Sequence, residues 1–307
     1  MKLFRKRRQA RTITGVHLAN GLIAAATIDR ERGRQSRLLH AECIEISGRS
    51  DPERALRAAL PPDHSTVNLV MAVDHYDLLL VEAPRVEPSE LRAAVRWKVK
   101  NLIDFHIDDA VIDVFEIPGQ QNRPQGQAMM YAVAARAREI QERIDLLENA
   151  DCELHAIDIT EMAMRNLAGR LDEDVRGVAL LYFSDDHGLI TLTHQGSLYL
   201  SRRLDTGIGA MLEDAAAAFD QITLEIQRSL DYYDSHFGQP PVSALYVLPG
   251  FAAHDALIEG LRDQLNVPVA GYSVDDVTTV ETALPDQHAG PLLIALGGAL
   301  RHEEVGL

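Results

Sequence analysis

The chain lacks the sequence features that mark several specialised classes of protein. Only two cysteines, Cys43 and Cys152, occur among its 307 residues, and they form no metal-ligand spacing. A disulfide-stapled fold is therefore excluded and a reducing compartment is expected. No apolar run approaches the roughly 18 to 20 residues of a membrane-spanning helix, and the first residues lack the apolar core of a signal peptide. We expect a cytoplasmic protein, which can still work close to a membrane.

Positive charge and catalytic motifs are also scarce. The 30 Lys and Arg residues stand against 46 Asp and Glu residues, and the net charge of -16 argues against nucleic-acid binding. A phosphate-binding P-loop, the Gly-x-Ser-x-Gly turn of the α/β hydrolases and a Cys–His pair are all missing from the sequence. The 12 histidines form no pair at helical ligand spacing. The sequence predicts neither a catalytic residue nor a metal site.

The basic residues are crowded at the start of the chain, where Leu3 and Phe4 add a small apolar tip. Two interpretations stay open for residues 1–11. The segment is either a solvated tail or a contact with an anionic membrane leaflet, where each basic residue near the surface contributes roughly 1 kcal/mol. The basic residues concerned are Lys2, Arg5, Lys6, Arg7 and Arg8.

Short apolar runs alternate with amphipathic segments, which predicts an α/β protein. The first half opens with a strand, a tight turn at Asn20-Gly21 and a second strand, and a third strand ends at Ile46. The second half repeats this order in the runs GVALLYF, LITLTH and SLYLSRRL, and a long helix follows at about 212–236. Two such lobes with a cleft between them form the architecture of actin-like and sugar-kinase-like nucleotide proteins.

Two helices of the first half carry start signals. Asp51 can cap a helix over residues 51–60, because its side chain can accept hydrogen bonds from the first N–H groups. Pro52 also suits the first turn of a helix. Ser89 is expected to cap a second helix that runs to about residue 103, with an apolar stripe on one face.

Four segments resemble the PilM-like family of type IV pilus assembly proteins. SELRAAVRWKVKNLIDFHIDDAVIDVFEI (89–117) is similar to the family's Arg-Trp segment, and LTHQGSLYLSRRLDTG (192–207) resembles its second-lobe strand pair. LEIQRSLDYYDSHFG (224–238) is very close to a family helix, and LIALGGALR (293–301) matches the closing helix. Within the family the chain is most similar to the branch that serves mannose-sensitive haemagglutinin pili, while EpsL-type secretion proteins and FtsA are more distant.

The resemblance implies a two-lobed actin-like fold, a ribonuclease H-like duplication with a small α+β subdomain inserted into the first lobe. It also implies a scaffold at the cytoplasmic face of the inner membrane. The expected segments are a basic tail at 1–11, a first lobe at 12–83 and 154–175, the inserted subdomain at 84–153, a second lobe at 176–289, and a closing helix and tail at 290–307.

The residues that would bind ATP in this family differ in the two hairpins. PilM has Gly-Ile-Asp-Ile-Gly-Ser-Ser in the first hairpin, and the chain replaces the Asp by His17 and the first loop glycine by Ala19. Mg²⁺ prefers oxygen ligands, so His17 is a poor substitute. The Asp-Ile-Gly of the second hairpin is replaced by Tyr182, Phe183 and Ser184. The other first-hairpin positions of the expected cleft are Gly15, Asn20 and Gly21.

The remaining cleft positions support the same interpretation. Asp185 and Asp186 are either substitute carboxylates or turn formers. Pro249 precedes Gly250 where relatives often have two glycines, and proline removes one N–H donor. We expect negligible ATP hydrolysis and no bound cofactor, while ATP binding without turnover stays open. The resemblance also assigns to the cleft Gly207, Glu225 and Arg228.

In PilM-like proteins a groove beside the inserted subdomain holds the short cytoplasmic tail of a single-span, PilN-like membrane protein. An extended tail can bond to an open strand edge, and an aromatic pocket can select one of its side chains. Trp97 is either such an anchor or a core residue. Two other functions stay open, an active actin-like ATPase and a sugar-kinase-like enzyme, although no motif supports the second. The matching partner residues are Arg92, Arg96, Trp97, Val111 and Val114.

Overall fold

The structure is a computed structural model, and it describes most of the chain. No helix in the described part is long and apolar enough to span a membrane. The basic start, with Lys2, Arg5, Lys6, Arg7 and Arg8, lies outside the described residues, as does Asn20. The described ranges are 12–19, 21–30, 36–46, 51–62, 66–120, 128–276, 278–281, 284–285 and 288–302.

The two lobes are built on the same plan around two mixed sheets. In each sheet three antiparallel strands are extended by parallel strands, with the order β14-β3-β2-β1-β4-β8 in the first lobe and β11-β10-β9-β12-β13 in the second. The duplicated α/β architecture expected from the sequence is therefore confirmed. The first-lobe strands are β1 (Thr12–Ala19), β2 (Leu22–Asp29), β3 (Arg37–Glu45), β4 (Val67–Met71), β8 (Leu154–Ile159) and β14 (Thr279–Val280). The second-lobe strands are β9 (Val178–Phe183), β10 (Gly188–His194), β11 (Ser197–Leu204), β12 (Ala244–Val247) and β13 (Val269–Gly271).

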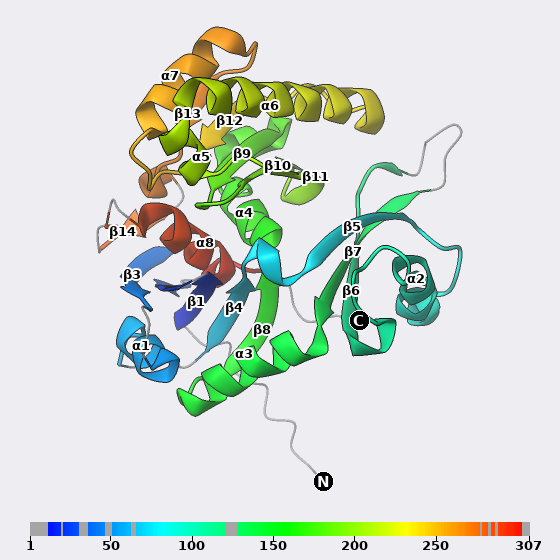
Figure 1. The fold of residues 1–307 in the computed structure, drawn as a ribbon, viewed down its shortest axis with the longest axis vertical. Coiled ribbons are helices and arrows are strands. Elements are labelled where there is room, and N and C mark those ends of the chain that lie inside the picture. The colour runs from blue at the N-terminus through cyan, green and yellow to red at the C-terminus, as the bar shows by residue number, and fades with distance from the viewer. Residues whose placement is uncertain are drawn as a thin grey trace.

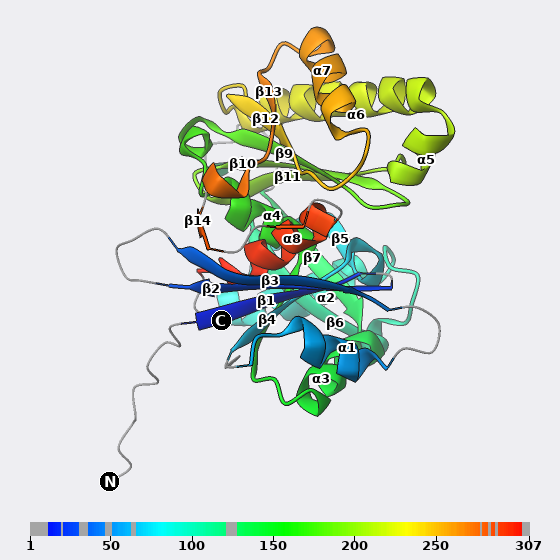
Figure 2. The ribbon, with the colours of Figure 1, turned by 90° about the vertical axis from the view of Figure 1, so that its left-hand side faces the viewer.

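Five layers stack along the molecule (Figure 2). Helices α1 and α3 cover the outer face of the first-lobe sheet, α4 and α8 lie between the two sheets, and α6 and α7 cover the outer face of the second-lobe sheet. The short helix α5 follows β11. The helices are α1 (Pro52–Ala59), α3 (Ala137–Asn149), α4 (Thr160–Ala168), α5 (Ile208–Glu213), α6 (Ala215–Phe237), α7 (His254–Gln264) and α8 (Ala289–Ala299).

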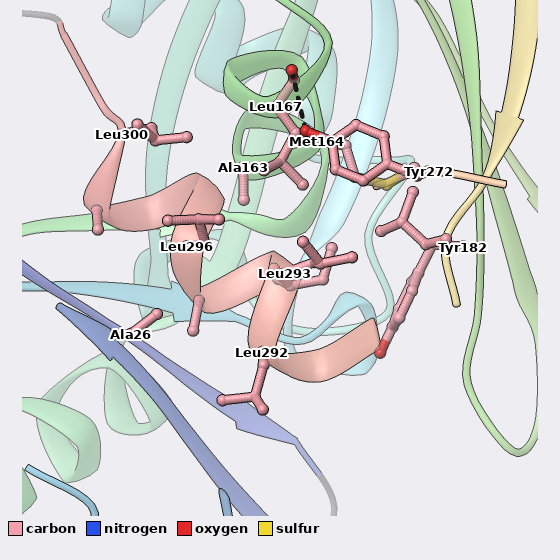
Figure 3. Packing of buried hydrophobic residues seen from close by; sticks show 14 of the residues in the cluster. Ala26, Ala163, Met164, Leu167, Tyr182, Tyr272, Leu292, Leu293, Leu296 and Leu300 are labelled. Atoms are coloured by element: carbon pink, nitrogen blue, oxygen red, sulfur yellow. Dashed lines mark hydrogen bonds between the residues drawn. The ribbon is translucent and has the colours of Figure 1, made fainter. Parts of the chain in front are cut away.

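Helix α8 joins the lobes through one apolar core. Its side chains lie between Ala26 of the first-lobe sheet and Tyr182 of the second, as Figure 3 shows. Strand β1 passes so close to α8 that a Cβ atom on Gly15 would lie 1.8 Å from the carbonyl oxygen of Ala295. The Tyr272 hydroxyl donates a hydrogen bond to Leu167 O of α4 at 3.3 Å, which adds a polar tie between the lobes.

A third sheet, with the order β5-β7-β6, forms the small subdomain together with α2 (Figure 1). This sheet starts earlier than the expected boundary at residue 84, because β5 pairs with β7. The end of the subdomain also differs from the expectation, since Leu147 of α3 packs into the first-lobe core. Its elements are β5 (Asp77–Glu82), α2 (Leu91–Val99), β6 (Ala110–Glu116) and β7 (Met129–Arg136).

Three expected helix boundaries can be compared with the structure. Asp51 caps α1, as predicted, by accepting a hydrogen bond from Glu53 N at 3.0 Å. The cap expected at Ser89 is wrong, because α2 begins at Leu91 after a 3₁₀ turn and no side chain caps it. The single long helix at 212–236 is two helices, since Asp214 interrupts it and caps α6 by accepting from Ala217 N.

Candidate functional site

The first hairpin places a buried, neutral histidine at the position where the resemblance implies a carboxylate. His17 is buried in β1, and its Nδ1 atom lies 3.2 Å from the carbonyl oxygen of Val70 on β4. The carbonyl can only accept, so Nδ1 carries the proton and donates. Burial lowers the pKa of His17 to about 4, so the ring is uncharged at neutral pH. The side chain therefore acts as a link between two strands.

Two glycines of the same hairpin have structural roles. One allows close contact with the backbone of α8, and the other adopts the backbone conformation of the turn. Gly15 lies under α8, where the helix backbone occupies the space of its missing side chain. Gly21 has a φ of 72°, a left-handed conformation that glycine adopts without strain, and its carbonyl accepts from Ile46 N at 2.6 Å. Ala19 ends β1 and is half-buried. Close packing thus accounts for Gly15 without a phosphate group.

The turn after β9 is held by hydrogen bonds within itself and to the start of α5. The Ser184 hydroxyl lies 3.0 Å from Nδ1 of His187, and Ser184 N donates to His187 O at 2.9 Å. The N–H groups of residues 208 and 209, at the start of α5, donate to the carbonyls of Ser184 and Asp185, both at 2.9 Å. Gly207 permits this contact, because a Cβ atom there would lie 2.3 Å from Asp185 O. The backbone donors of residues 184, 208 and 209 are therefore already engaged within the protein.

Tyr182 occupies the space next to this turn. Its side chain is buried in the interlobe core beside Leu293, and its ring lies 3.3 Å from the position that a Cβ atom on Gly290 would take (Figure 3). Asp185 and Asp186 are exposed in the turn. Tyr182, the bulky residue expected from the sequence, therefore packs against α8. The exposure of both aspartates favours the interpretation that they are turn formers.

An ion pair crosses from one lobe to the other beside the second hairpin. The Arg203 guanidinium of β11 lies 2.8 Å from Oδ1 of Asp74, in the turn that follows β4. The same guanidinium lies 3.3 Å from Nδ1 of His187. Burial, and then the positive charge of Arg203, lower the pKa of His187, so its ring is neutral and Nδ1 accepts. A polar chain from Asp74 through Arg203 and His187 to Ser184 thus spans the cleft.

Glu161 is a cleft residue that the sequence analysis missed. It lies in the first turn of α4, and the Tyr76 hydroxyl donates to one of its oxygens. The Ser201 hydroxyl of β11 donates to the other oxygen at 3.4 Å, which is a third polar tie between the lobes. Burial raises the pKa of the Glu161 carboxyl. An acidic residue in the first turn of a helix is common for electrostatic reasons, so no pattern in the sequence distinguished this one.

The cleft keeps a cavity at the turn between β12 and α7. The cavity holds about 850 Å³, within the range of small-molecule sites. Gly250 has a φ of 116°, and a Cβ atom there would lie 2.8 Å from Gly290 N, so the turn packs directly on α8. Among the expected cleft residues that the structure describes, Pro249 and Gly250 line the cavity and the others do not. The lining residues also include Phe251, His254, Asp255, Tyr272, Asp275, Ala289 and Leu293.

Glu225 and Arg228 are not brought to this cavity. Both lie on α6, where Glu225 pairs with Arg228 at 2.6 Å and with Arg202 of β11 at 3.3 Å. The pair with Arg202 joins the helix to the edge strand of the second-lobe sheet, while the pair with Arg228 lies within the helix. Among the described residues, no group of three or more His, Cys, Asp or Glu side chains could hold a metal ion.

The expected partner residues do not form one groove. Val114 packs with Val95 and Val99 of α2 in the core of the small subdomain, so its assignment as a partner residue is wrong. Val111 lies an odd number of residues away on the same strand, so it projects from the opposite face of the sheet, and it is 46% exposed. Trp97 is 75% exposed on α2, so its interpretation as a core residue is wrong.

The two expected arginines of α2 serve the subdomain itself. Arg96 donates to the carbonyl oxygens of Ile107 and Ala110, which holds the turn before β6. Arg92 pairs with Asp113 of β6 at 3.1 Å. Both contacts tie the helix to the outer strand of the small sheet.

Comparisons with known proteins agree with this geometry. The model of the family described as type IV pilus assembly protein PilM matches residues 64–208. No curated protein matches the chain significantly. The structure of a PilM–PilN type IV pilus biogenesis complex aligns with a TM-score of 0.74 at 16% identity, covering 95% of this chain and 98% of the matched chain.

Two further structures place the fold in a wider group. The cytoplasmic domain of EpsL, an inner-membrane component of the Vibrio cholerae type II secretion system, aligns with a TM-score of 0.54 at 11% identity, covering 95% of this chain and 96% of that domain. A Bacteroides thetaiotaomicron protein described as having an actin-like ATPase fold aligns with a TM-score of 0.50 at 8% identity, covering 88% of this chain and 93% of that chain. The chain has the actin-like ATPase fold.

Proposed function

We propose that the protein is a non-catalytic, PilM-like scaffold of type IV pilus assembly at the cytoplasmic face of the inner membrane. The match of the PilM family model and the similarity to the PilM–PilN complex support the pilus assignment. The segments quoted in the sequence analysis are most similar to MshI, the PilM-like protein of mannose-sensitive haemagglutinin pilus biogenesis. This similarity favours a pilus of that type. The observation that supports the non-catalytic role is the bonded state of the second hairpin, where Arg203 lies 2.8 Å from Asp74 and 3.3 Å from His187.

The proposed partner is the cytoplasmic tail of a single-span, PilN-like membrane protein. The choice of partner is supported by the aligned complex, in which a PilM protein is assembled with PilN. In this chain the Val111 face of the small sheet supports such a site, because β6 is an edge strand and Val111 is 46% exposed. An extended tail could add hydrogen bonds along β6 and bury Val111.

Binding of a synthetic partner tail tests this function. We expect the full chain to bind the tail equally well with and without Mg²⁺-ATP, because a scaffold needs no nucleotide cycle. Val111→Glu should abolish binding, since a charge would be buried at the contact. Trp97→Ala, on the other side of the subdomain, is the matched control and should bind normally. A tail that binds only in the presence of ATP would contradict the proposal.

An actin-like protein that binds nucleotide without hydrolysis is a second candidate. The cavity of about 850 Å³ beside Pro249 and Gly250 favours it. Titration of ATP, with and without Mg²⁺, separates the two candidates. Saturable binding that Pro249→Trp removes would support the second candidate, and absence of binding would leave the first.

We further propose that the basic start, residues 2–8, attaches the protein to the membrane surface. Its five positive charges contrast with the acidic remainder of the chain. Deleting these residues, or adding salt, should weaken binding to anionic vesicles. Unchanged binding in both tests would identify the segment as a solvated leader.

A further inference from the structure

The outer side of α2 carries an exposed tryptophan that the fold does not use. Val95 and Val99 of this helix are fully buried against the small sheet, whereas Trp97 is 75% exposed. Leu102, just after the helix, is 55% exposed. Trp97 is the only tryptophan of the chain. A large aromatic residue left in water, five positions before a second exposed large apolar residue, suits an interaction surface.

The charges around this residue are unusual for the chain. Residues 91–103 hold four basic residues and no acidic residue, although the whole protein has a net charge of -16. Lys98 and Lys100 are two of only four lysines in the sequence, and Lys100 Nζ lies 5.6 Å from the centre of the Trp97 ring. Lys98 is 3.4 Å from Glu82 in an exposed pair of the kind that contributes at most about 1 kcal/mol. Such a pair can yield to another anion.

We propose that Trp97, Lys98, Lys100 and Leu102, the Trp97 surface, dock onto an anionic lipid bilayer. An indole ring prefers the boundary between lipid tails and water, and lysines can lie along that boundary while their ammonium groups reach the headgroups. The two apolar side chains are interspersed with cations, which suits a headgroup layer better than the continuous apolar groove of a protein partner.

The composition of the chain start supports a lipid as the occupant. The other two lysines, Lys2 and Lys6, flank Leu3 and Phe4 in the sequence. Each lysine of the chain is therefore within two sequence positions of a large apolar or aromatic residue. A single weak contact gives only reversible membrane binding, whereas two contacts together hold a protein at the surface. The Trp97 surface would supply a second contact and fix the orientation of the small subdomain. It does not depend on partner binding, so either proposal can fail alone.

The fluorescence of Trp97 tests this inference directly, because no other tryptophan contributes. The full chain is mixed with vesicles that contain phosphatidylglycerol and phosphatidylcholine, or phosphatidylcholine alone. We expect the anionic vesicles to shift the emission maximum to the blue, and brominated acyl chains to quench it. Lys98→Gln and Lys100→Gln should each weaken the partition by about fivefold at low salt.

Two exposed residues elsewhere serve as matched controls. Leu212→Ala on α5 and Arg138→Gln on α3 should leave the partition unchanged. The blue shift should persist at saturating lipid after deletion of residues 2–8. The inference is overturned if anionic vesicles leave the emission unchanged, if phosphatidylcholine alone gives the same shift, or if the shift appears only with an acidic protein or peptide.

Discussion

At the scale of single residues, His17 forms an internal hydrogen bond at the position where the resemblance implies an aspartate in PilM. Burial of the imidazole favours its neutral form, and the hydrogen bond that Nδ1 donates to Val70 O offsets this effect only in part. Its folded pKa of about 4 lies below the unfolded value of about 6.5. The stability from this group is therefore complete above pH 6.5 and is lost as the pH falls towards 4.

The pH dependence of stability should report this residue. Between pH 7 and pH 4 we expect the wild type to lose about 3 kcal/mol more than the His17→Gln variant. Glutamine can keep a donor towards Val70 O but takes up no proton in this range. Urea unfolding at a series of pH values measures the free energy of unfolding of both proteins. Subtracting one curve from the other cancels the contribution of the carboxylates, which both proteins share. Parallel curves for the two proteins would show that His17 titrates normally.

Gly15 makes a second residue-scale prediction. A Cβ atom on Gly15 would meet the backbone of α8 at 1.8 Å, and backbone cannot move aside as a flexible side chain can. Gly15→Ala should therefore cost about 3 kcal/mol or more. Gly169→Ala is the matched control, because its nearest neighbours lie at 3.4 Å. Thermal unfolding compares the two, and equal melting temperatures would refute the packing role assigned to Gly15.

At the scale of elements, the small subdomain is joined to the second lobe along β11. Tyr131 of β7 accepts a hydrogen bond from Ser201 N at 3.1 Å and lies with Ile117 in the apolar core of the second lobe. The hydroxyl also donates to Tyr199 O at 3.4 Å. The edge strand of the second-lobe sheet is thus covered by a side chain of another subdomain.

Removing one hydroxyl should loosen this junction. Tyr131→Phe leaves Ser201 N without its acceptor, so we expect a loss of about 1 to 3 kcal/mol and faster hydrogen exchange at that amide. Tyr232→Phe on α6 is the control, since its ring stacks on His236 at the helix surface. If the Ser201 amide exchanges at the same rate in both variants, β11 does not depend on Tyr131.

Patterns within short segments predicted which residues form a strand better than they predicted which other strand it pairs with. The run SLYLSRRL alternates in a way that favours a strand, and it is β11. In contrast, the predicted boundary at residue 84 places β5 in the first lobe, because the sequence of β5 carries no record of its pairing with β7, about 50 residues later. The same reason applies to Glu161 and to Gly15, whose roles depend on Ser201 and Ala295, far away in the sequence.

At the scale of the whole molecule, the two lobes are joined by a continuous apolar core and by polar ties across the cleft. Helices α4 and α8 pack between the sheets, and Tyr272, Glu161 and Arg203 add hydrogen bonds or an ion pair between the lobes. The sequence predicted the altered hairpins from their missing carboxylates and glycines. It could not predict that His17 bonds to Val70 within the first lobe or that Tyr182 packs in the core between the lobes, because those contacts exist only in the folded chain.

Steady-state phosphate release from Mg²⁺-ATP tests the central claim of a closed, non-catalytic cleft most directly. The measurement uses the purified full chain beside the double variant Asp185→Asn, Asp186→Asn, which removes the two exposed carboxylates nearest the second hairpin. We expect no release above background from either protein, because His17 supplies no carboxylate and the turn at Ser184 is bonded to itself. Steady, Mg²⁺-dependent release that the double variant abolishes would contradict the account and would identify the two aspartates as a working substitute site.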